Sequence, residues 1–103
     1  MLNLYDLICK WLSDNQNKFE GLSFYMSYVE EKYKESDYDT KIILATCVKT
    51  GARRLFEINV ATNEVNVTHP TAKIRINAAA PDFFETLENE MLGTLTDTKL
   101  ESK

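Results

Sequence analysis

The sequence predicts a small α+β domain in which helices pack against an antiparallel sheet. Apolar residues recur at helical spacing near the start of the chain and again near its end. Between these segments they alternate with polar residues, which is typical of strands with one buried face. A length of 103 residues suits one domain, which we place at 1–95, followed by a polar tail at 96–103.

The composition of the chain narrows its class further. The chain is 44% hydrophobic and 27% charged, unlike a disordered chain, and its net charge is −4. An acidic balance disfavours attraction of the whole surface to nucleic acid or to an anionic membrane. The sequence has no apolar run of about 20 residues and no signal-peptide pattern, and its two cysteines form no CxxC pair. We therefore expect a cytoplasmic protein with no membrane partner.

Two helices are predicted at the N-terminal end. The first covers 3–14, and its apolar stripe consists of Leu4, Leu7, Ile8, Trp11 and Leu12. The second covers about 23–34, and its stripe consists of Leu22, Tyr25, Met26, Val29 and Tyr33. Phe24 and Tyr28 lie off that stripe, so the second helix is expected to be apolar on more than one side.

About four strands follow in a predicted antiparallel meander. The first is the apolar run 40–48, whose length and β-branched residues favour a strand. The next three alternate, and their apolar positions are Phe56, Ile58, Val60, Val65, Val67, Ile74 and Ile76. We expect Val60 to pair with Val65 and Val67 to pair with Ile74, which places the whole set on one face. The opposite face then carries Glu57, Asn59, Asn66, Thr68, Lys73 and Arg75.

The last predicted element is an amphipathic helix over 82–95, which follows Pro81 and packs on the apolar face of the sheet. From 40 to 95 the order of elements is similar to the ββββα unit of the transcriptional-coactivator and Whirly families of single-stranded-DNA binders. Members of those families dimerise in part through that helix. The resemblance concerns the order of elements, so it implies no site residue in this chain.

Surplus apolar surface predicts a protein interface. The strand 40–48 is expected to be an edge strand, yet it is apolar on both faces, and natural edge strands usually carry charge. Aromatic residues are also enriched in the cores of interfaces. The predicted interface consists of Phe24, Tyr28, Ile42, Leu44, Val48 and Leu55. We expect a non-catalytic adaptor, inhibitor or regulatory protein that self-associates as a homodimer.

A basic patch suggests single-stranded nucleic-acid binding as the alternative function. The patch consists of Arg53, Arg54, Lys73 and Arg75, from the first hairpin and the outer face of the last strand. Single strands are usually gripped by such a patch together with stacked aromatic rings. The outer face of the predicted sheet has no aromatic residue.

The sequence contains no recognisable catalytic, metal or cofactor motif. One histidine, His69, and the isolated Cys9 and Cys47 do not make up the usual zinc sets, and glycine motifs that bind phosphate are missing. His69 is predicted opposite Phe56, where a pairing with Cys47 leaves an unfamiliar enzyme as a third hypothesis. We expect no enzyme activity, no cofactor and no small-molecule substrate.

Overall fold

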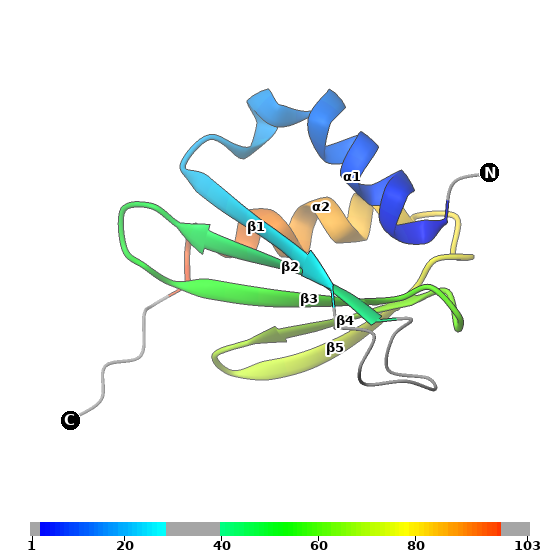
Figure 1. The fold of residues 1–103 in the computed structure, drawn as a ribbon. Coiled ribbons are helices and arrows are strands. Elements are labelled where there is room, and N and C mark those ends of the chain that lie inside the picture. The colour runs from blue at the N-terminus through cyan, green and yellow to red at the C-terminus, as the bar shows by residue number, and fades with distance from the viewer. Residues whose placement is uncertain (1–2, 29–39, 98–103) are drawn as a thin grey trace.

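A computed structural model confirms the α+β class and shows a five-stranded antiparallel sheet with both helices over one face (Figure 1). It describes residues 3–28 and 40–97. The elements are α1 (Leu4–Asp14), the 3-10 helix η1 (Gln16–Phe19), β1 (Leu22–Tyr28), β2 (Thr40–Cys47), β3 (Arg53–Asn59), β4 (Glu64–His69), β5 (Ala72–Asn77) and α2 (Phe83–Gly93). No helix in this described part is long and apolar enough to cross a membrane.

The predicted second helix is wrong, because residues 22–28 form the strand β1; the remainder of that prediction, 29–34, lies outside the described residues. The segment fits both periods, since its larger apolar residues also alternate with Ser23, Tyr25 and Ser27. Gly21 precedes the strand with a φ of 91°, a left-handed conformation that glycine adopts without strain. Pairing with β2 then satisfies the backbone groups of β1 that face β2.

The position of β2 in the sheet also differs from the prediction. The strand order is β1-β2-β3-β4-β5, so β2 lies between two neighbours and is not an edge strand. The edges are β1 and β5. The helices cover the apolar residues on one side of β2. The apolar residues on its other side have no helix over them in the described part of the chain.

The hairpin registers decide which side chains share a face. The predicted register of β4 and β5 is confirmed, with Val67 opposite Ile74. The register of β3 and β4 differs from the prediction by two residues, since Val65 faces Ile58 instead of Val60. A slip of two residues preserves the alternation of side chains, so the predicted apolar set still shares one face.

A turn built on two asparagines causes that slip. The Oδ1 of Asn59 accepts hydrogen bonds from the backbone N–H groups of Ala61 and Thr62, each at 3.0 Å. Asn63 adopts a φ of 63°, a left-handed conformation that asparagine tolerates better than most residues. The four-residue connection that results ends β3 at Asn59.

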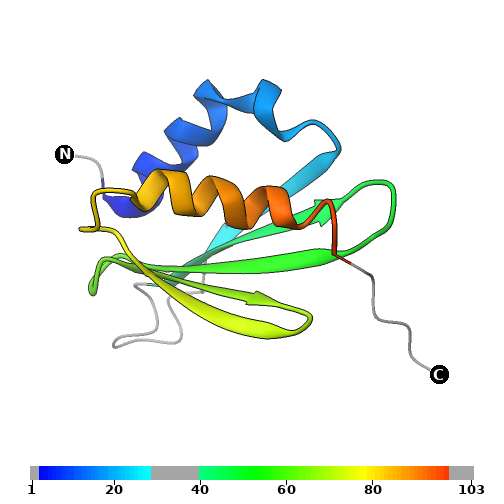
Figure 2. The ribbon, with the colours of Figure 1, turned by 180° about the vertical axis from the view of Figure 1, so that it is seen from behind.

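Both helices cover the same side of the sheet, which we call the inner face (Figures 1 and 2). The buried core between the helices and the sheet includes Leu4, Ile8, Leu12, Phe19, Ile43, Ala45, Phe56, Ile58, Val65, Val67, Ile76, Phe83, Leu87 and Met91. Aromatic rings join the helices to β1: the ring of Phe19 lies 5.6 Å from that of Trp11 and 5.7 Å from that of Phe24. The opposite side, the outer face, has no helix over it in the described part of the chain.

Candidate interaction surface

The strand registers align side chains in rows across the outer face. The central row runs from β1 to β5 and consists of Tyr25, Leu44, Leu55, Thr68 and Lys73. Neighbouring strands are about 4.8 Å apart, so the three apolar members of this row are in reach of one another. The next row along the strands carries, from β2 to β5, Ile42, Glu57, Asn66 and Arg75. The apolar residues thus lie on one half of the face and the polar ones on the other.

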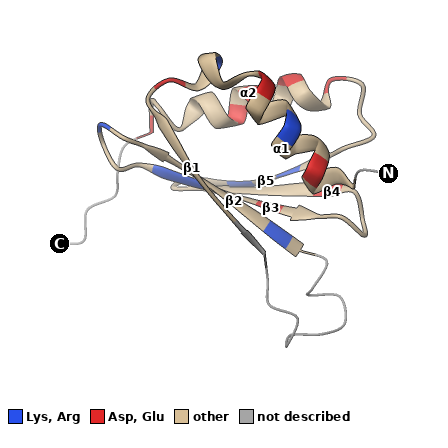
Figure 3. Ribbon diagram, turned by 45° about the horizontal axis from the view of Figure 1, so that its top comes forward, with Lys and Arg blue, Asp and Glu red and all other residues tan. Residues whose placement is uncertain are grey.

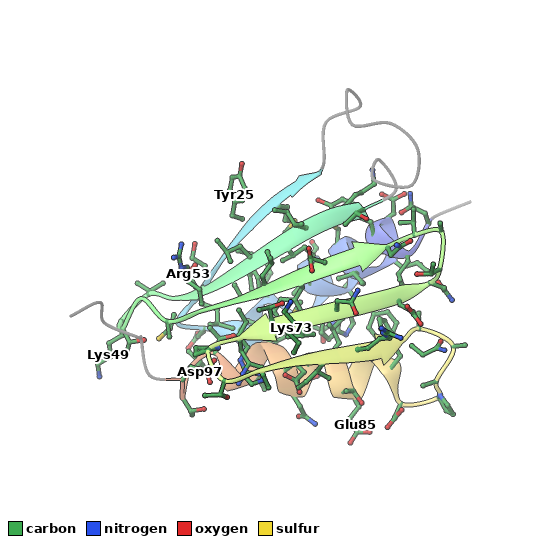
Figure 4. All side chains as sticks on the ribbon, turned by 90° about the horizontal axis from the view of Figure 1, so that it is seen from below. Tyr25, Lys49, Arg53, Lys73, Glu85 and Asp97 are labelled. Atoms are coloured by element: carbon green, nitrogen blue, oxygen red, sulfur yellow. The ribbon has the colours of Figure 1, made fainter. Side chains whose placement is uncertain are left out.

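The apolar half of the outer face is open to solvent. Tyr25 is 62% exposed, and Figure 4 shows it projecting from β1. Ile42, Leu44 and Leu55 are half-buried. Val48, in the turn between β2 and β3, is 69% exposed. A depression of about 370 Å³ extends from this half of the face towards the turn between β4 and β5.

Cations border the apolar surface. Arg53, Lys73 and Arg75 are all exposed and lie on the outer face, on β3 and β5. Figure 4 shows Arg53 and Lys73 on this face. Glu57 and Glu64 place two carboxylates on the same face, Glu64 at the far end of β4 opposite Asn59 and Asn77. Most acidic residues of the described segments lie on or near the helices instead, on the other side of the sheet (Figure 3). The rim of the outer face is therefore positive although the net charge of the chain is −4.

The structure brings together three of the predicted interface residues. Ile42, Leu44 and Leu55 share the outer face, and Val48 follows at the end of β2. Phe24 lies on the inner side of the sheet, where its ring packs edge-on against Phe19. Tyr28 ends β1, and its side chain is outside the described part.

Tyr25 is the residue of this surface that sequence reasoning missed. The helical interpretation of 23–34 assigned it to a buried stripe, whereas strand alternation places it opposite Leu44 on the outer face. The usable signal was the strand-like alternation from Leu22 to Tyr28, which gives Tyr25 the same parity as Ser23 and Ser27. Because of that error, the expected lack of an aromatic residue on the outer face is also wrong.

Arg54 is separated from the other residues of the predicted basic patch. It lies on the inner face, where its Nε donates to Oδ2 of Asp97 at 2.6 Å and its Nη2 donates to Oδ1 at 2.8 Å. Its Nη1 donates to Oε1 of Glu90 at 2.6 Å. The hydrogen bonds from Arg54 hold the pKa of Asp97 below its ordinary value, and those to Asp97 raise the pKa of the guanidinium.

Gly93 makes room for this ion-pair cluster at the end of α2. A Cβ atom at Gly93 would lie 2.8 Å from Cζ of Arg54, closer than such atoms approach in practice. The cluster therefore fixes the C-terminal end of α2 and the following residues, up to Asp97, against the sheet. The cluster thus packs α2 against the sheet and holds the guanidinium of Arg54 on the inner face.

The third hypothesis required Cys47 and His69 to come together. Cys47 ends β2 and is 3% exposed, and hydrogen bonds from the side chain and backbone of Thr50 lower the pKa of its thiol. His69 ends β4, on the other side of β3. The position opposite Phe56 is occupied by Val67, so the predicted placement of His69 there is wrong. Among the described residues, no three His, Cys, Asp or Glu side chains gather as a metal-binding group.

In comparisons with protein-family models, curated proteins and solved structures, nothing significantly matches this chain. The class is therefore defined by the fold and the surface themselves: an α+β domain whose helices cover one face of the sheet and, within residues 3–28 and 40–97, leave the other without a helix.

Proposed function

We propose that this chain is a non-catalytic protein-interaction module whose docking surface is the outer face of the sheet. One observation carries the proposal: both helices lie on the inner face, and the outer face keeps the apolar row of Tyr25, Leu44 and Leu55. A sheet with one solvated face usually presents polar residues on that face. Contiguous exposed apolar residues with a polar rim typically mark interaction sites.

Charge indicates the chemistry of the partner. Arg53, Lys73 and Arg75 border the apolar row, so they favour a protein segment with apolar side chains at its centre and carboxylates beside them. Complementary charge of this kind accelerates association and disfavours basic partners. Such a module acts as an adaptor, inhibitor or regulator and needs no cofactor. Its free cysteines favour a reducing compartment, and we place it in the cytoplasm.

The double variant Ile42→Glu, Leu44→Glu should keep the fold and lose the partner. Both residues are half-buried on the outer face, so new carboxylates there remain hydrated but oppose an apolar, acidic segment. The measurement is affinity capture from the source cell with wild-type and variant protein, quantified by mass spectrometry, with circular dichroism to verify folding.

Leu7→Glu provides the matched control, because Leu7 is 43% exposed on α1, away from the outer face. We expect proteins captured by the wild type to remain with Leu7→Glu and to fall at least tenfold with the double variant. Equal capture by all three proteins would remove the outer face as the docking surface.

Single-stranded nucleic-acid binding is the second candidate function, and Tyr25 is the observation that favours it. This residue supplies an aromatic ring on the same face as Arg53, Lys73 and Arg75. Stacking on such a ring beside a basic track is the usual way to grip a single strand. Arg54 does not contribute, because it is paired with Glu90 and Asp97 on the inner face.

Fluorescence anisotropy with a labelled oligonucleotide at low salt tests this candidate. If it is right, Lys73→Gln with Arg75→Gln weakens binding and reduces the slope of log K against log salt by about 1.4, the equivalent of two phosphate contacts. No change in anisotropy up to about 100 µM protein, the weak limit of non-specific binding, eliminates it.

A further inference from the structure

The two edges of the sheet differ in their protection against another strand. The edge strand β5 carries Lys73 and Arg75, and charged side chains discourage pairing at an edge. The other edge strand, β1, has seven residues without a charge, a proline or a glycine. In the described part of the chain β1 has β2 as its one strand neighbour. β1 is therefore a template on which another strand can pair.

The β1–β2 ladder fixes which backbone groups of β1 are open. The N–H of Val48 donates to the C=O of Gly21 at 2.9 Å, so these residues form a hydrogen-bonded pair. Such pairs alternate along an antiparallel ladder, so Ser23, Tyr25 and Ser27 direct their backbone groups towards β2. The residues whose N–H and C=O groups point away from β2 are Leu22, Phe24, Met26 and Tyr28.

We propose that the open edge of β1 pairs with β1 of a second copy of this chain, antiparallel, with Tyr25 on the two-fold axis. This register overlaps both strands along their full length and sets Leu22 opposite Tyr28 and Phe24 opposite Met26. It gives about eight backbone hydrogen bonds, two for each of the facing pairs, compared with about ten direct hydrogen bonds in a typical interface. This proposal deepens the proposed function and rests on it in one respect: both treat the chain as a protein that binds other protein chains.

The side chains along this edge fit a second copy. Tyr25 meets Tyr25 of the second copy at a non-hydrogen-bonded pair, where side chains approach most closely. On the inner side, Phe24 meets Met26 of the second copy beside a cleft of about 490 Å³ that both residues line. Met26 is 43% exposed and Tyr25 is 62% exposed, so pairing covers the two exposed large apolar side chains of β1. Because β1 bears no charge, the symmetric pairing sets no like charges opposite one another within the two strands.

Pairing at this edge also extends the docking surface. The central rows of the two copies join across the two-fold axis, so Leu55, Leu44 and Tyr25 continue into the same residues of the second copy. Five strand spacings separate the two Leu55 residues, a distance of about 24 Å. Lys73 lies at each end of this joined row. An elongated acidic partner with apolar side chains can then bind along one continuous surface that spans both copies.

A charge exchange at the two-fold axis tests the pairing. Tyr25→Lys and Tyr25→Glu each place like charges opposite one another, whereas a mixture of the two variants places opposite charges there. The mass is measured by light scattering coupled to size-exclusion chromatography at low salt. We expect the wild type near twice 11.9 kDa, each variant alone near 11.9 kDa, and the equimolar mixture near twice that mass again. Tyr25 is exposed, so both variants should match the circular dichroism of the wild type.

Met26→Pro supplies a second, independent test. It removes an N–H group that points to the open edge and leaves the β1–β2 ladder intact, a position where strands tolerate proline. We expect Met26→Pro to be monomeric and Ile42→Glu, Leu44→Glu to remain dimeric, which separates this proposal from the docking function of the outer face. A monomeric wild type at about 100 µM, a weak affinity even for transient complexes, overturns the proposal. Dimers of both Tyr25 variants would also overturn it. So would a monomeric wild type whose captured partner is lost in Met26→Pro, because the open edge would then pair with a strand of a different protein.

Discussion

Arg54→Met should lower the free energy of unfolding by about 3 kcal/mol, because it leaves buried carboxylates without their cation. Methionine retains the apolar stem of the arginine but donates nothing to Glu90 and Asp97, whose side chains are 19% and 14% exposed. We place the loss at the lower end of the range for a broken buried pair because both carboxylates keep some contact with water. Urea unfolding followed by circular dichroism measures the change.

Arg53→Met is the matched control, since the neighbouring arginine is exposed on the outer face. Its effect on the free energy of unfolding should stay within about 0.5 kcal/mol. Similar losses in the two variants would contradict the role of the inner-face ion pairs.

The loss in Arg54→Met should also depend on pH in a defined direction. The hydrogen bonds from Arg54 hold the pKa of Asp97 below its ordinary value of 3.8, so the unfolded chain binds the proton more readily than the folded one. This contribution to stability is complete above about pH 4 and is lost as the pH falls through the lower pKa of the folded state. The difference between wild type and variant is therefore largest near neutral pH and shrinks in acid.

The sequence predicted correctly those elements whose apolar residues fit either the helical repeat or the strand repeat but not both. The helical stripe of 3–14 and the alternation from Phe56 to Ile76 gave the correct element types, and a two-residue error in one hairpin left the inner set unchanged. Residues 22–28 fit both periods, and the choice was decided by pairing with β2, which local sequence does not reveal. That single error displaced Tyr25 and made β2 an apparent edge strand.

The division of the basic residues was predictable only in part. Arg54 has the same parity as Phe56 and Ile58, so strand alternation was a usable signal that it faces inwards. Asp97 gave no such signal, because it follows α2 in a polar segment that was expected to lie outside the domain. Its place beside Arg54 depends on a contact between residues 43 positions apart in the chain.

Ile43→Glu should leave the chain unfolded at neutral pH. Ile43 is 0% exposed and lies between Met26 on β1 and Phe56 on β3, on the inner face beneath the helices. A carboxylate at this position loses its hydration without gaining a cation, at an effective cost of several kcal/mol. The lost burial of isoleucine adds about 2 kcal/mol more. The sum is comparable with the 5–15 kcal/mol that stabilises a typical domain.

Ile42→Glu is the control that gives this prediction its meaning, because it makes the same replacement one position away, on the outer face. We expect its circular dichroism and amide NMR dispersion to resemble those of the wild type, while Ile43→Glu loses both. If both variants unfold, the outer face is itself part of the core, and the surface on which we propose docking does not exist. If both remain folded, the helices do not seal the inner face. A difference between these neighbours therefore tests the division of the sheet into covered and uncovered faces, on which the proposed function depends.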